Sequence, residues 1–164
     1  MGVQRVLTRL SLPEVTLKLA TIDDLSIMFH WQSNPQIRRF SRNTQTITYE
    51  EHAQWFISSM SMKDRHMYMV CSAGKKLGIL RLDKQEIEQS VKRYEISILI
   101  APEAQRKKLA LKAIHAIPSS FDSCEIYAYV HPQNKASHHL FTQTNFVKLT
   151  ESSYLRPPYQ LPSY

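Results

Sequence analysis

The sequence predicts a single α/β domain in which strands and helices are arranged around one sheet. Segments with apolar residues at every second position are typical of half-buried strands, and segments with apolar residues three and four apart are typical of amphipathic helices. One helical segment also joins two strand segments in the middle of the chain, which favours a parallel pair of strands there. The predicted order is one strand, two helices, three strands, a helix, a strand, a helix and two strands.

Length and composition indicate one globular domain with a substantial core, since the chain has 164 residues, 43% hydrophobic and 21% charged. We expect residues 1–15 to form an N-terminal leader, residues 16–156 the folded domain and residues 157–164 a C-terminal tail. No apolar run approaches the roughly 20 residues of a membrane span, and the leader lacks the apolar core of a signal peptide. Val6 stands where a myristoylation signal has Ser or Thr. No membrane partner is therefore expected.

The two cysteines, Cys71 and Cys124, each lie in an apolar segment with strand-like alternation. Such residues are more often small buried side chains than a disulfide or a metal pair. Their usage favours a cytoplasmic location, and we expect no metal site.

The net charge of +7 suits a polyanionic partner, which includes nucleic acids, nucleotides and coenzymes. The basic residues are dispersed along the chain, and neither a zinc-ligand spacing nor an aromatic RNA-binding strand accompanies them. This pattern disfavours nucleic acid as the partner.

Capping residues predict where the helices begin, and proline and glycine predict where helices end and strands turn. Thr21 or Asp23 can cap the first helix, Asn34-Pro35 ends it, and Thr48 begins a capping box for the second helix. Gly74 permits a tight turn between two strands of a hairpin. The expected ranges are strands at 15–20, 67–71, 77–82, 94–101, 124–130, 146–149 and 154–155, and helices after residues 21, 48, 103 and 132.

The stretch from Tyr94 to Ala110 organises the chain. Pro102 ends the strand, and a helix is expected from Glu103 with three cations in its first turn. Unsatisfied amides, the helix dipole and these cations would favour a bound anion. A solvated basic turn is the alternative. The strand residues Tyr94, Ile96, Ile98 and Ile100 fall on one face, and Glu95, Ser97 and Leu99 on the other.

Three stretches together resemble the GCN5-related N-acetyltransferase (GNAT) superfamily, over residues 16–155. ILIAPEAQRKKLA is similar to the family's strand end and pyrophosphate loop, with Lys108 where glycine is usual. VHPQNKASHHLFTQTNF is similar to the family's later helix: Asn134, Ser137, Phe141 and Phe146 match, and Asn145 replaces the usual glycine. Phe141 also fills the position where the family often has a tyrosine that acts as the general acid. FHWQSNPQIRRF and TYEEHAQWF resemble acceptor-side helices of the branch that acetylates amino-sugar nucleotides and, more distantly, protein N-termini.

The resemblance implies a central mixed, mostly antiparallel sheet, helices on both faces, and acetyl-CoA lying where the parallel fourth and fifth strands splay apart. It implies that strand backbone pairs with pantetheine, that loop amides hold the pyrophosphate, that Asn134 bonds the pantetheine arm and that Phe141 packs near the thioester. The cofactor-binding residues expected are Ile98, Leu99, Ile100, Gln105, Arg106, Lys107, Lys108, Leu109, Ala110, Asn134 and Phe141.

The resemblance also points to Glu95 as the base that takes a proton from the acceptor ammonium. The alternative is a strand glutamate paired with Arg93 or a lysine. No general acid is assigned, because Phe141 cannot donate a proton; His138, His139 or a water are the alternatives. Candidates to line the acceptor pocket are Trp31, His52 and Trp55, which could instead be core residues. Arg38 and Arg39 could bind a diphosphate on the acceptor, or they could form a solvated face.

The function expected is therefore transfer of acetyl from acetyl-CoA to the primary amine of a small molecule, an amino-sugar nucleotide. One alternative is an enzyme that acetylates a protein N-terminus, of the ribosomal-protein type. The other is a non-catalytic acyl-CoA-binding or interaction domain, for which Lys108, Phe141 and Asn145 would be the evidence. The oligomeric state is open, with a homodimer as one alternative.

Overall fold

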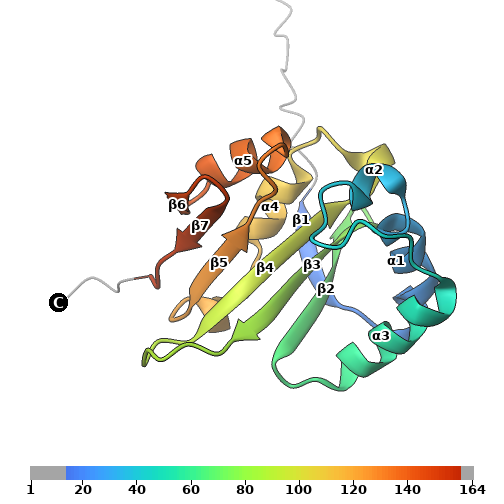
Figure 1. Cartoon of the computed structure of the whole chain (residues 1–164), viewed down its shortest axis with the longest axis horizontal. Coiled ribbons are helices and arrows are strands. Elements are labelled where there is room, and N and C mark those ends of the chain that lie inside the picture. Colours follow the sequence, from blue (N-terminus) through green and yellow to red (C-terminus); the bar gives the residue numbers. More distant parts are fainter. Residues whose placement is uncertain (1–13, 160–164) are drawn as a thin grey trace, which may run out of the picture.

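The computed structural model describes residues 14–159, which form a seven-stranded sheet with helices on both sides (Figure 1). The strand order is β1-β2-β3-β4-β5-β7-β6, and every neighbouring pair is antiparallel except the parallel pair β4 and β5. This confirms the predicted fold class. The strands are β1 (Val15–Leu19), β2 (Arg65–Ser72), β3 (Lys75–Gln85), β4 (Arg93–Ile100), β5 (Glu125–Tyr129), β6 (Val147–Thr150) and β7 (Ser153–Arg156).

Five α-helices are present in the described part of the chain. They are α1 (Leu25–Gln32), α2 (Pro35–Arg38), α3 (Tyr49–Ser61), α4 (Leu109–His115) and α5 (Lys135–Thr142). The Thr48 capping box forms as predicted: Glu51 N–H donates to Thr48 Oγ1 at 3.2 Å, and Thr48 N–H donates to Glu51 Oε2 at 2.8 Å. The short helix α2 was not predicted; its first residue is Pro35, and the Asn34 side chain accepts from Gln36 N–H at 2.9 Å.

The two faces of the sheet have different chemistry. On the face covered by α4, Tyr94 packs edge-on against Phe121, with ring centroids 5.0 Å apart, and Ile96 and Ile126 are buried. On the opposite face, β3 and β4 present charged side chains beside the group of helices α1, α2 and α3 (Figure 1). Apolar side chains are buried on both faces, since Met28, Trp31 and Phe56 of α1 and α3 belong to the core, but the face beside these helices also carries charged side chains on β3 and β4.

The parallel pair separates before β4 ends. The register of β4 with β5 runs from Arg93 opposite Glu125 to Ile96 opposite Ala128, and no pair follows. On its other side β4 stays paired with β3 as far as Ile100, which lies opposite Gly78. The segment 97–100 consequently has a strand neighbour on one side only.

The prediction that a helix begins at Glu103 is wrong. Residues Pro102–Ala104 form a single 3₁₀ turn, and α4 begins only at Leu109. Arg106 and Lys108 have φ values of 63° and 58°, in the left-handed region that an α-helix excludes. The three cations therefore lie in a loop before α4 and not in its first turn.

Both cysteines are free and buried, as predicted. The expected tail residues 160–164 and most of the leader, residues 1–13, lie outside the described residues, and Val15 is the first residue of β1. Within residues 14–159, the structure has no helix with the length and apolar character needed to cross a membrane.

Candidate active site

The open edge of β4 beyond the split can pair with an extended ligand. Ile98, Leu99 and Ile100 are half-buried, and β3 pairs with them from one side only. Backbone N–H and C=O groups on an unpaired strand edge hydrogen-bond with an added strand or an amide-bearing ligand. The edge therefore fits an arm that carries amide groups.

The basic loop lies directly after this edge. Arg106, Lys107 and Lys108 are exposed, whereas Leu109 is buried and anchors the first turn of α4. The first helical bond runs from Lys112 N–H to Lys108 C=O, 3.1 Å, so the amides of the first turn have no intrahelical acceptor. Three cations and these amides fit a pyrophosphate.

Lys108 adopts the backbone conformation that glycine adopts easily, although it is a lysine. Its φ of 58° and ψ of 20° are left-handed, a conformation that costs a residue with a Cβ about 1–2 kcal/mol. Gln105 also contributes locally, because its side-chain amide donates to the Ile100 carbonyl at 3.2 Å. Lys108 thus combines a glycine-like backbone conformation with a positive charge in the loop.

Glu95 lies on the polar face of β4, two residues before the unpaired segment. Its carboxylate accepts from Arg42, with 2.6 Å between Nη2 and Oε1, and from the Gln85 side-chain amide, with 3.0 Å between Nε2 and Oε2. The side chain is 22% exposed, so a ligand in the split can reach it. Arg93, the alternative partner considered from the sequence, instead pairs with Glu125.

A second charged group lies beside Glu95 on the same face. Asp83, which faces Glu95 in the β3–β4 register, pairs with both Arg65 at 2.5 Å and Arg81 at 2.7 Å. The two guanidinium groups lie over the Trp55 ring, 5.6 and 5.4 Å from its centroid. Trp55 therefore lies at the charged face of the sheet, as a residue that lines an acceptor site would.

The loop between α2 and α3, residues 39–48, carries Arg42 towards β5. Arg38 anchors the loop through bonds to backbone carbonyls, at 2.6 Å to Gln45 and 2.7 Å to Asn43. These bonds occupy the Arg38 guanidinium, so the structure does not present it to an acceptor diphosphate. Phe40, in the same loop, contacts His131 just after β5, with ring centroids 5.6 Å apart. The loop thus spans from the helices to the end of β5.

Trp31 and His52 lie in the packing of the helices and not at the charged face. Trp31 is 2% exposed and His52 3% exposed. The His52 ring contacts Phe29, Trp55 and Phe56, and its Nε2 atom has no hydrogen-bond partner. Contact of either residue with an acceptor would require the helices to separate, so neither is part of the site proposed below.

Burial of His52 predicts a pH-dependent stability. Desolvation lowers the pKa of His52 below 6.5, and a bond to the Leu25 backbone offsets this only in part. The unfolded chain therefore binds a proton at pH values where the folded chain does not, and stability falls as pH drops from 6.5 towards the lowered pKa, by at most about 1.4 kcal/mol per pH unit. We expect His52→Leu to flatten this part of a curve of unfolding free energy against pH.

The matched control for this measurement is His139→Gln, which alters an exposed histidine of α5. Urea unfolding at several pH values between about 5 and 8 gives the curves. An unchanged acid slope in His52→Leu would contradict the assignment of a neutral buried imidazole.

Two residues expected to contact the cofactor, Asn134 and Phe141, lie at the N-cap and in the last turn of α5. Asn134 caps the helix, because its Oδ1 accepts from Ser137 N–H at 3.1 Å, and its amide NH₂ remains able to donate to a ligand. Phe141 is buried against Phe146 and Tyr154. The Tyr154 hydroxyl is 2.7 Å from His138 Nδ1. A hydroxyl–imidazole pair therefore adjoins Phe141, which itself cannot donate a proton.

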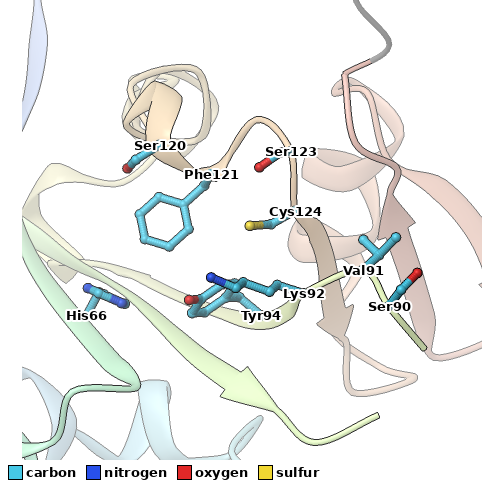
Figure 2. Close-up of a pocket in the computed structure, with 9 residues that line it drawn as sticks. All are labelled: His66, Ser90, Val91, Lys92, Tyr94, Ser120, Phe121, Ser123 and Cys124. Carbon is cyan, nitrogen blue, oxygen red and sulfur yellow. The ribbon is translucent and has the colours of Figure 1, made fainter. Parts of the chain in front are cut away.

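A cavity of about 460 Å³ lies at the other end of β4 (Figure 2). Its wall includes Lys92, just before β4, and Tyr94 near the start of the strand, with Phe121 and Cys124 from the segment before β5. The predicted site residues of β4 lie further along this strand, and none of them lines the cavity. The predicted site and this cavity are therefore two separate features of β4.

A sheet that splits between two parallel strands, a basic loop beside the split and a strand carboxylate facing it define a class of enzyme that acylates amines from coenzyme A thioesters. The family model described as the acetyltransferase (GNAT) domain matches residues 14–147, and the chain belongs to this family. The predictions of the superfamily, of an N-acetyltransferase acting on amines and of acetyl-CoA as its cofactor are confirmed.

Solved structures share the fold at low sequence identity. Spermidine N-acetyltransferase from Vibrio cholerae, in complex with CoA and spermine, is 24% identical, with a TM-score of 0.73 and coverage of 84% of this chain and 83% of that one. An acetyltransferase from Thermus thermophilus is 16% identical, with a TM-score of 0.74 and coverage of 89% and 98%. AAC(6')-Ib in complex with ribostamycin and coenzyme A is 15% identical, with a TM-score of 0.70 and coverage of 88% and 93%. A search of curated protein sequences found no match.

Three residues of the site were not identified from the sequence: Arg42, Gln85 and Tyr129. Arg42 follows a basic run, and the sequence pattern does not indicate which acidic residue it meets. Gln85 was expected in a loop, but β3 extends as far as this residue and brings it to Glu95. Tyr129 lies at the end of β5 with its ring centroid 4.8 Å from the Arg42 guanidinium carbon. For Tyr129, the sequence offers only the alternating pattern of β5, which indicates the face of the strand on which this residue lies but not its contact with Arg42.

Proposed function

We propose that this enzyme transfers acetyl to the primary amine of a nucleotide-linked amino sugar, with Glu95 as the base. The proposal is supported by Glu95, which lies two residues before the unpaired segment of β4, bonds Arg42 and lies opposite Asp83, the partner of two further arginines. The carboxylate can accept a proton from an ammonium group, and the arginines suit an acceptor that bears phosphate.

Different residues bind different parts of acetyl-CoA. The backbone of 98–100 pairs with the pantetheine arm, the amides and cations of 106–110 hold the pyrophosphate, and the Asn134 amide donates to the arm. Acetyl-CoA supplies an electrophilic thioester carbonyl and a thiolate able to leave. Glu95 takes the ammonium proton at one of its carboxylate oxygens, directly or through a water, so that the neutral amine can attack.

The measurement that tests the cofactor site is titration calorimetry of acetyl-CoA and coenzyme A into the protein. Lys108→Glu is expected to weaken binding about tenfold to 100-fold, because a carboxylate replaces a cation beside the pyrophosphate. Lys108→Gly removes the charge but keeps the left-handed backbone, so it should weaken binding less and stabilise the fold by about 1 kcal/mol.

Lys63→Glu is the matched control, since Lys63 is exposed and precedes β2 at the opposite end of the sheet. It should bind coenzyme A like the wild type. Absence of any heat or thermal shift at millimolar acetyl-CoA would reject the proposed cofactor site and favour a non-catalytic role for this chain.

A further inference from the structure

We infer that Arg42 occupies, in the free enzyme, the position at Glu95 that the acceptor ammonium takes on binding. The preferred acceptor then carries an anionic phosphate group, which binds the guanidinium that the ammonium has displaced. The inference rests on the proposed function and names the chemical class of its acceptor: an amine that also bears phosphate. It excludes polycationic amines as preferred acceptors.

Each oxygen of the Glu95 carboxylate already accepts one hydrogen bond, Oε1 from Arg42 and Oε2 from Gln85. A carboxylate oxygen can accept a second bond, so an ammonium that approaches Oε1 competes with the Arg42 guanidinium for the same negative charge. The Arg42 side chain is 60% exposed, and exposed ion pairs of this kind contribute little free energy. An acceptor ammonium can therefore exchange with the guanidinium at low cost.

The Tyr129 ring can hold the Arg42 guanidinium after it leaves Glu95. The guanidinium already lies over this ring, which can retain it by a cation–π interaction. The loop that carries Arg42 is fixed at its base by the Arg38 bonds to Asn43 and Gln45. The side chain can therefore swing while the loop backbone stays in place, and a free guanidinium remains at the mouth of the site.

The carboxylates on this face of the sheet are already paired with arginines. On strands β2 to β5, all within the described residues, the carboxylates are Asp83, Glu95 and Glu125, and each has an arginine partner. Asp83 has two. A polyamine finds no unpaired carboxylate on these strands for its additional ammonium groups. A phosphate-bearing amine instead replaces one cation at Glu95 and brings an anion to the released arginine.

The experiment compares acetyl transfer to glucosamine, glucosamine 6-phosphate, a uridine-diphosphate-linked amino sugar and spermidine. For the wild type we expect kcat/KM to be at least about tenfold higher for the phosphorylated amines than for glucosamine or spermidine. Arg42→Gln should raise KM for the phosphorylated amines about tenfold more than it changes KM for glucosamine, because only the phosphorylated amines lose an anion–guanidinium contact. Lys148→Gln is the control, because it removes an exposed cation of β6, the edge strand on the far side of β5 and β7 from β4, and it should behave like the wild type.

The outcomes separate the inference from the proposal on which it rests. If spermidine is preferred, the inference and the nucleotide-linked acceptor both fall, while acetyl transfer to amines stands. If the phosphorylated amines are preferred but Arg42→Gln changes all acceptors equally, only the inference is overturned. If the wild type binds coenzyme A but acetylates none of these amines, both fall. A thermal-unfolding midpoint of Arg42→Gln close to that of the wild type shows that altered KM values do not arise from misfolding.

Discussion

Replacement of Glu95 by glutamine is expected to lower kcat about 10²- to 10⁴-fold, the range over which a positioned base contributes to proton transfer. The amide keeps the size of the side chain and its bond to Arg42 through the remaining oxygen, but it cannot accept the ammonium proton. Affinity for coenzyme A should change little, because Glu95 precedes the unpaired segment 97–100 that is proposed to hold the arm.

Steady-state kinetics between about pH 6 and 9, with calorimetry of coenzyme A, measure both effects. Glu125→Gln is the matched control: it removes a carboxylate paired with Arg93 on the next strand, where no proton transfer is proposed. A Glu95→Gln enzyme with nearly wild-type kcat would show that another group, or solvent, deprotonates the amine.

Introduction of a methyl group at Gly78 is expected to destabilise the sheet strongly. A Cβ at Gly78 would lie 2.3 Å from the Leu99 carbonyl oxygen and 3.2 Å from the Ile100 Cα atom. Both are backbone atoms, so β3 and β4 must move apart. We expect Gly78→Ala to lower the unfolding free energy by about 3 kcal/mol and the melting temperature by about 6–12 °C.

The same displacement moves the edge of β4, so affinity for acetyl-CoA should fall in parallel with stability. Gly74→Ala is the matched control, because a Cβ there meets no atom within 4 Å and only the φ of 74° is strained. It should lower the unfolding free energy by about 1 kcal/mol and leave cofactor binding unchanged. Equal losses in the two variants would mean that the contact with Leu99 does not constrain the sheet.

Local patterns in the sequence were sufficient for much of the fold. The Thr48 capping box and the alternation from Tyr94 to Ile100 depend on neighbours within a few residues, and both appear in the structure as expected. The start of α4 was missed for the opposite reason. Glu103 opens a pattern with good helix formers, but the chain turns through left-handed residues at Arg106 and Lys108 before the helix begins.

By itself, the sequence determined the family resemblance, the cofactor class and the strand that carries Glu95, because these follow from short motifs and from the period of the side chains. The tertiary structure decided which groups meet Glu95: Arg42 lies far earlier in the chain, and only the path of the loop 39–48 across the sheet brings them together. It also placed Trp31 and His52 in the core and Trp55 at the charged face, since helices α1 and α3 each bury one side. Charge pairing and burial depend on contacts between distant segments, and the spacing of residues along a chain does not encode them.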